Sequence, residues 1–322
     1  MHYRRLGHTG LEVSEIGFGA WGIGADAWKG ASDSESLDSM RRAVELGVTF
    51  IDTAIAYGSG HSEELVGQIK RESPEVAIAT KINPANLEWP AKHTTPADVA
   101  FSAEHVIERT EQSLRNLGLE TIDLQQFHVW SDSWVDQGTW LEGIEKLKAD
   151  GKIRFFGISV NDHEPESVLK LVSSGLVDSV QVIYNIFDQS PEDELLPLCE
   201  RHDVGVIVRV PLDEGGLTGK VQPDTVFQPG DWREGYFQGE RKIEAWKRVL
   251  AITVDLGVET ERMPEMALRF CLSHRAVSTV IVGMRTVAHV EANTAVSDGE
   301  VLSADQIARL RTHRWVRNWY QS

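Results

Sequence analysis

The sequence comprises 322 residues, of which 41% are hydrophobic, and its formal net charge at pH 7 is −17. This acidic balance argues against binding to nucleic acids or anionic membranes, because both require clustered cations. No apolar run approaches the roughly 18 residues of a membrane span, and the N-terminal residues MHYRRLGHTG lack the apolar segment of a secretory signal. Cys199 and Cys271 lie within helical patterns, which argues against a disulfide scaffold or a cysteine-bound metal. We therefore expect a cytoplasmic protein without a metal site.

Short apolar runs alternate with amphipathic helical patterns along the chain. Most of the runs are apolar on both sides of the alternation, as parallel strands covered on both faces should be. The expected strands are residues 15–18, 49–52, 76–80, 122–127, 154–158, 179–183, 204–210 and 279–282. Helical patterns at residues 34–47, 102–118, 139–151 and 191–205 each end at a glycine.

Eight such β–α units, with no linker or low-complexity stretch, predict a single barrel domain over residues 1–322. Residues 3–14 favour a hairpin that turns at residues 8–10, and residues 303–319 favour an extra C-terminal helix. A doubly wound open sheet is the alternative. A doubly wound sheet that binds a dinucleotide carries a glycine-rich fingerprint between its first strand and the helix that follows. The segment GFGAWGIG is glycine-rich but opens no immediate helix, which argues against this alternative.

Four chemically complementary side chains lie at the C-terminal ends of predicted strands or in the loops just beyond them. Asp52 and Tyr57 lie in FIDTAIAYG, Lys81 in AIATK and His128 in LQQFH. An unperturbed phenol has a pKa near 10 and is a poor acid at neutral pH, whereas a neighbouring ammonium lowers that pKa. A carboxylate can hold the ammonium in place. The set therefore suggests a phenol that protonates a carbonyl oxygen while another group attacks the carbonyl carbon.

These four residues and several longer segments resemble the aldo-keto reductase family. The segments are YRRLGHTGLEVSEIGFGAWGIG, FIDTAIAYGSGHSEELVG, GKIRFFGIS, PLDEGGLTGK and IVGMRTVAHVEANTAV. The resemblance spans nearly the whole chain. It implies a (β/α)8 TIM barrel, plugged by the N-terminal hairpin, that uses a nicotinamide cofactor to reduce an aldehyde or ketone. In this family's tetrad Tyr57 would be the general acid, Lys81 would lower its pKa and Asp52 would anchor Lys81. His128 would orient the substrate oxygen or share the proton.

The resemblance also implies residues around the nicotinamide. Gln181 matches the amide that binds the nicotinamide carboxamide, and Ser159 and Asn161 follow the preceding strand. The family commonly has Ser directly followed by Asn, so the intervening Val160 leaves open that Asn161 instead caps the next turn. The backbone of three residues would approach the ribose, where small side chains permit close contact. They are Gly19, Ala20 and Trp21.

The segment GMRTVAHVEAN resembles the adenosine-binding segment of the family. Gly283 and Arg285 would meet the 2′-phosphate, and Thr286 would cap the helix whose N-terminus faces it. A guanidinium pairs far better with a phosphate dianion than with a hydroxyl, so Arg285 favours NADPH, with NADH bound more weakly. His289 occupies a position that usually holds a polar residue, and Asn293 matches the adenine contact.

The seventh strand departs from the common pattern of the family. Arg209 stands where many relatives have an aromatic ring stacked on nicotinamide. Its guanidinium could stack on the ring, or it could turn away to pair with Asp213 or Glu214. We expect these two carboxylates to point outward, away from the pyrophosphate. The remaining predicted cofactor-binding residues are Asp52, Pro211, Leu212, Gly216 and Lys220.

Aromatic residues in the predicted β–α loops suggest an apolar pocket for a bulky or cyclic carbonyl compound. The predicted lining is Trp21, Tyr57, Trp89, His128 and Trp130. Alternatively, about half of the loop tryptophans merely pack loop against helix; the loop tryptophans are Trp21, Trp89, Trp130, Trp134 and Trp232. The favoured function is NADPH-dependent carbonyl reduction of a small molecule. Oxidation of a sugar or secondary alcohol is an alternative, because hydride transfer is reversible. A cofactor-binding regulatory subunit with little turnover is another.

Overall fold

The computed structural model describes residues 1–24, 28–30, 32–315 and 317–320. Eight parallel strands close into a barrel in the order β10-β3-β4-β5-β6-β7-β8-β9, and a separate antiparallel hairpin pairs β1 with β2. This topology confirms the predicted (β/α)8 barrel. The barrel strands are β3 (Ile16–Gly19), β4 (Phe50–Asp52), β5 (Ala77–Ile82), β6 (Ile122–Phe127), β7 (Ile153–Ser159), β8 (Ser179–Ile183), β9 (Gly205–Arg209) and β10 (Val277–Gly283).

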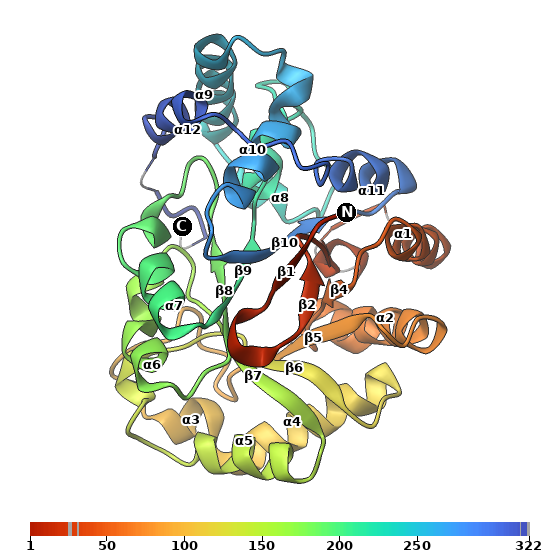
Figure 1. Ribbon diagram of the computed structural model, residues 1–322, viewed down its shortest axis with the longest axis vertical. Coiled ribbons are helices and arrows are strands. Elements are labelled where there is room, and N and C mark those ends of the chain that lie inside the picture. The colour runs from red at the N-terminus through yellow and green to blue at the C-terminus, as the bar shows by residue number, and fades with distance from the viewer. Residues whose placement is uncertain (25–27, 31, 316, 321–322) are drawn as a thin grey trace.

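Helices surround the strands as an outer ring (Figure 1). They are α1 (Asp33–Glu45), α2 (His61–Glu72), α3 (Ala97–Phe101), α4 (Ala103–Leu117), α5 (Trp140–Ala149), α6 (Leu169–Ser174), α7 (Leu195–His202), α8 (Arg233–Tyr236), α9 (Arg241–Leu256), α10 (Met263–Leu272), α11 (Val287–Thr294) and α12 (Ala304–Arg311). Local signals set their ends. In α4, the Ser102 hydroxyl accepts a hydrogen bond from the His105 N–H, and Gly118 adopts the left-handed conformation. No helix in the described ranges is long and apolar enough to cross a bilayer.

The predicted strand positions agree with the structure to within two residues, and the runs 122–127 and 179–183 coincide with β6 and β8. The helix expected to end at Gly205 is different. It ends at His202, Asp203 takes the left-handed conformation with φ of 54°, and Gly205 opens β9. Glycine is required there for another reason, because a Cβ at Gly205 would lie 2.6 Å from the Leu6 side chain.

The hairpin of β1 (Tyr3–Arg5) and β2 (Glu12–Ser14) covers one end of the barrel (Figure 1). Leu6 and Val13 are fully buried and belong to the same apolar cluster as Phe50, Leu124 and Ile207 from the barrel strands. Removing these side chains from water stabilises the closed end. The hairpin therefore plugs the barrel, as the resemblance implied, and leaves the opposite end for a site.

The C-terminal segment differs from its prediction. The helix expected over residues 303–319 ends at Arg311, and Val316 lies outside the described residues. The following residues instead lie against the body of the protein: the Trp315 N–H donates to the Phe187 carbonyl at 2.8 Å, and the two rings meet edge to face. Tertiary contacts have thus replaced the helical hydrogen bonds that the local pattern favoured.

Candidate active site

The four chemically complementary residues converge at the end of the barrel opposite the hairpin. Asp52 ends β4, Lys81 lies one residue before the end of β5, and His128 follows β6. Tyr57 opens a short 3-10 helix after β4. The carboxyl ends of parallel barrel strands meet at one rim, so residues distant in sequence become neighbours there.

Lys81 is the centre of this cluster and is completely buried. Its ammonium donates to the Asp52 carboxylate, to the Thr53 carbonyl at 2.9 Å and to the Tyr57 hydroxyl at 3.1 Å. The second Asp52 oxygen accepts from Gln126 at 3.1 Å and from Gln181 at 2.7 Å. Asp52 therefore both neutralises Lys81 and is itself held by two amides.

Electrostatics keep Lys81 charged and Tyr57 protonated. Burial alone would lower the pKa of Lys81, but Asp52 and Tyr57 outweigh it and the net pKa is raised. Burial raises the pKa of Tyr57, and the Lys81 ammonium opposes this only in part. The expected net lowering of the Tyr57 pKa is therefore not seen, because desolvation of the phenolate exceeds the attraction of Lys81. The phenol carries its proton at neutral pH and points a donor toward the cavity.

His128 is neutral and fixed by its neighbours. Burial lowers its pKa well below the usual value, and the cations Lys81 and Arg209 lower it further. Its Nδ1 lies 3.0 Å from the Asn83 side-chain oxygen, and its ring meets the Tyr57 ring nearly perpendicularly with centroids 5.9 Å apart. Tyr57 and His128 thus face the same space.

A cavity of about 1070 Å³ begins at Tyr57 and His128 and extends toward α11. Ligand sites of this size are typical for drug-sized molecules or larger. Most of the predicted cofactor and substrate residues line it. They are Gly19, Ala20, Trp21, Asp52, Tyr57, Trp89, His128, Gln181, Arg209, Pro211, Leu212, Lys220, Gly283, Arg285, His289 and Asn293.

Four predicted residues lie elsewhere. Trp130 is completely buried between Phe127 and Trp140, so it packs loop against helix. The Asn161 side-chain oxygen accepts from the Ala91 N–H at 3.4 Å. Its amide nitrogen donates to the Ala91 carbonyl at 3.3 Å and to the Glu164 carboxylate. Ser159 is buried beside Gln181 in the sheet, and Gly216 packs against Asp213. Trp130 therefore fits the alternative interpretation, in which some of the loop tryptophans pack loop against helix and do not line the pocket.

The seventh strand corrects two expectations. Arg209 turns neither to Asp213 nor to Glu214. Its guanidinium donates to the Asp162 carboxylate and to the Val160 carbonyl, both at 2.8 Å.

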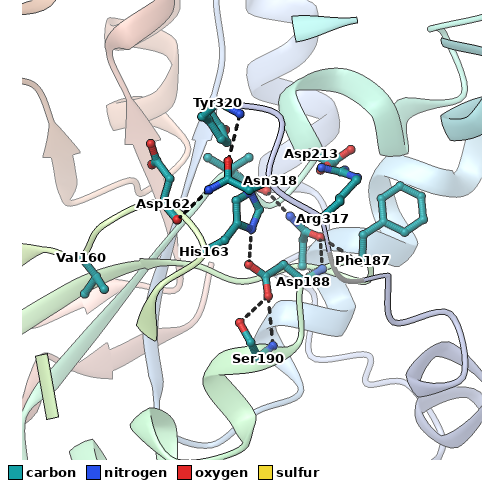
Figure 2. Close-up of polar contacts among 12 residues, drawn as sticks. Val160, Asp162, His163, Phe187, Asp188, Ser190, Asp213, Arg317, Asn318 and Tyr320 are labelled. Atoms are coloured by element: carbon teal, nitrogen blue, oxygen red, sulfur yellow. Dashed lines mark hydrogen bonds and ion pairs between the residues drawn. The ribbon is translucent and has the colours of Figure 1, made fainter. Parts of the chain in front are cut away.

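Asp213 and Glu214 do not point outward either, since they are only 1% and 7% exposed. Arg317 donates to Asp213, and Tyr320 donates to Glu214 at 2.5 Å. The C-terminal tail, residues 317–320, supplies both partners, and Figure 2 shows Arg317 beside Asp213.

Cations gather at the far end of the cavity. Arg285 donates to the Lys29 carbonyl at 2.8 Å and lies over the Trp28 ring at 5.3 Å. Arg233 lies over the same ring at 4.2 Å, so Trp28 is flanked by two guanidinium groups. Thr286 caps α11 as predicted, with its hydroxyl accepting from the His289 N–H. This end is suited to an anionic group.

Several residues of the site were not predicted. Gln126 and Asn83 hold Asp52 and His128, and both could have been suspected as polar residues within or just after a buried strand. Trp319 and Tyr320 line the cavity from the end of the chain. Their sequence carries no signal of this role, because only the fold brings the tail to the barrel rim.

A closed β–α barrel with buried titratable groups in a deep cavity at the carboxyl ends of its strands defines an enzyme of the barrel class. The Aldo/keto reductase family model matches residues 15–314. The chain therefore belongs to the aldo/keto reductase family and is an oxidoreductase of the carbonyl-reducing type.

The aldo-keto reductase YhdN of Bacillus subtilis is 31% identical and aligns over 95% of this chain and 92% of its own length. The NADH-specific methylglyoxal reductase of Escherichia coli is 30% identical over 93% of this chain and 94% of its own. Among solved structures, the glycerol dehydrogenase of Gluconobacter oxydans has a TM-score of 0.76 at 27% identity and covers 97% of this chain and 94% of its own.

Proposed function

We propose that this protein reduces an aldehyde or ketone to the alcohol with NADPH, with Tyr57 as general acid. The observation that carries the proposal is the 3.1 Å contact from the buried Lys81 ammonium to the Tyr57 hydroxyl, at the inner end of the cavity. A protonated phenol that borders a ligand cavity and is backed by a fixed cation is suited to donate its proton.

The cavity residues suit a nicotinamide dinucleotide. The volume admits a dinucleotide with a small substrate, Gln181 offers an amide beside the tetrad, and Lys220, Arg285 and His289 line the far end. A bound reduced nicotinamide supplies the hydride that goes to the carbonyl carbon. Tyr57 donates its proton to the carbonyl oxygen, and Lys81 stabilises the resulting phenolate. Asp52 keeps Lys81 in place, and the neutral His128 orients the substrate oxygen.

Arg285 is the basis for proposing NADPH over NADH. A guanidinium near the adenosine end would pair with a 2′-phosphate, and the Lys220 ammonium would add to the attraction. Burial, Lys220 and Arg285 lower the pKa of His289, so its ring would contribute hydrogen bonds and no charge. The E. coli relative, by its name, is NADH-specific, so NADH belongs in every assay as the comparison cofactor.

The proposal is tested with a panel of carbonyl compounds, following oxidation of NADPH. Tyr57→Phe keeps the ring and removes only the proton donor, so turnover should fall by about 10²–10⁴-fold with little change in NADPH affinity. Lys81→Met should also suppress turnover. Wild-type-like turnover of the Tyr57→Phe variant would contradict the role of Tyr57.

Oxidation of an alcohol is the second candidate function, since the neighbouring structure from Gluconobacter oxydans is named a glycerol dehydrogenase. The same tetrad would then act in reverse, with the Tyr57 phenolate accepting the hydroxyl proton. Comparing kcat/KM for carbonyl reduction and for oxidation of polyols and secondary alcohols decides the preferred direction. Bound NADPH with no turnover of any compound in either direction would instead favour a regulatory subunit.

A further inference from the structure

Asp162 joins two walls of the cavity through its carboxylate. It follows β7 and is only 5% exposed. One carboxylate oxygen accepts from Arg209 at 2.8 Å, and the other accepts from the indole N–H of Trp89 at 3.0 Å. Its backbone carbonyl accepts from Asn318 of the C-terminal tail at 3.3 Å (Figure 2). Asp162, in the loop after β7, is therefore a common attachment point for the loop after β5, the end of β9 and the C-terminal tail.

Trp89 needs this attachment because it has little packing of its own. It is 43% exposed, in contrast to the completely buried Trp130. Its ring stands edge to face against His128 with centroids 4.6 Å apart and lines the cavity beside Tyr57. A half-exposed indole on a loop has many accessible rotamers. The hydrogen bond to a charged, buried carboxylate selects the one that faces His128.

We propose that Asp162 is a positioning residue that sets substrate specificity by holding Trp89 against His128. This inference rests on the proposed carbonyl reduction and adds the residue that shapes the substrate end of the cavity. A fixed aromatic wall beside the carbonyl-binding groups favours a planar aromatic substrate, which gains contact without first ordering the wall. A short aliphatic aldehyde has no ring to lie against this wall and gains little from it.

The test compares 4-nitrobenzaldehyde with propanal, with NADPH as cofactor. Trp89→Phe keeps an aromatic ring but removes the indole N–H, and Asp162→Ala removes the acceptor. Each should lower the ratio of kcat/KM for 4-nitrobenzaldehyde over propanal by about tenfold, the effect of one hydrogen bond to a charged group. The change should appear mainly as a higher KM for 4-nitrobenzaldehyde.

Trp134→Phe is the matched control. The Trp134 indole donates to the Thr95 carbonyl at 2.7 Å and is 1% exposed, so the variant also loses an indole hydrogen bond. Trp134 packs against Phe101 and Trp130 in the core. Its loss should lower thermal stability and leave the substrate ratio unchanged.

The double variant shows whether Asp162 acts through Trp89. If it does, Trp89→Phe/Asp162→Ala will have the same substrate ratio as Trp89→Phe alone, whereas independent effects would multiply. A ratio unchanged in both single variants, or multiplied in the double variant, would overturn the inference.

A readout without turnover separates this inference from the proposed function. The indole N–H resonance missing from Trp89→Phe identifies Trp89 in an NMR spectrum, and Asp162→Ala should shift it toward the position of a solvent-exposed indole. If wild-type protein reduced neither aldehyde, the proposed function would fail. The position of this resonance would still show whether Asp162 holds the Trp89 indole. An unmoved resonance would refute the role of Asp162.

Discussion

Burial of Glu214 should make the protein less stable as the pH rises. Burial raises the pKa of Glu214 from 4.5 to about 7; the Tyr320 hydrogen bond lowers it, and the neighbouring Asp213 raises it. Between these values the folded protein retains a proton that the unfolded chain has released. The free energy of unfolding therefore falls as pH rises through this range, and the loss is complete above about pH 7.

The size of the effect follows from the two pKa values. At about 1.36 kcal/mol for each tenfold change in proton affinity, a buried ionised Glu214 costs about 3 kcal/mol above pH 7. With an unfolding entropy of about 2.1 cal/mol/K per residue, this corresponds to about 4–5 °C in Tm. Glu214→Gln keeps an oxygen that can accept from Tyr320 and cannot ionise. The variant should therefore match wild type near pH 4.5 and exceed it at pH 8.

Urea unfolding of wild type and Glu214→Gln between pH 5 and 8.5 measures this difference. The advantage of the variant should grow by about 2–3 kcal/mol across the range. Glu108→Gln, at an exposed position of α4, changes the net charge equally and serves as the control. A difference between Glu214→Gln and wild type that stayed constant within about 0.5 kcal/mol would refute the reasoning.

Three further predictions concern the cavity and its tail. Arg285→Ala should weaken NADPH by about 1.5–3 kcal/mol and NADH much less in fluorescence titrations, and equal losses would assign Arg285 a structural role. Arg209→Tyr should strengthen binding of NADP⁺ more than binding of NADPH, because the guanidinium repels only the positively charged oxidised ring. The ratio of the two dissociation constants should change by about fivefold, and an unchanged ratio would reject contact between Arg209 and nicotinamide. Arg317→Met leaves Asp213 buried and unpaired, so the free energy of unfolding in urea should fall by about 3–5 kcal/mol, and Asp213→Asn in the same chain should recover most of it. A loss below about 1 kcal/mol for Arg317→Met would show that the tail detaches freely.

The sequence alone determined the barrel and the neighbourhood of its chemistry. Strand and helix signals are local, because burial on both faces produces apolar runs and glycine ends helices within a few residues. In a parallel barrel every strand ends at the same rim, so placing Asp52, Lys81 and His128 at or just beyond strand ends already placed them near one another. The position of Thr286 as a helix cap was equally local.

Only the tertiary structure decided which side chains pair across the rim. Nothing near Arg209 in sequence indicates Asp162 as its partner, and nothing near Glu214 indicates Tyr320, because 47 and 106 residues separate these pairs. The same holds for the indoles. Trp89 and Trp130 both follow barrel strands, yet one lines the cavity and the other fills the core. Periodicity reports whether a side chain faces apolar surroundings, whereas its partner depends on loops and a tail that long-range packing brings together.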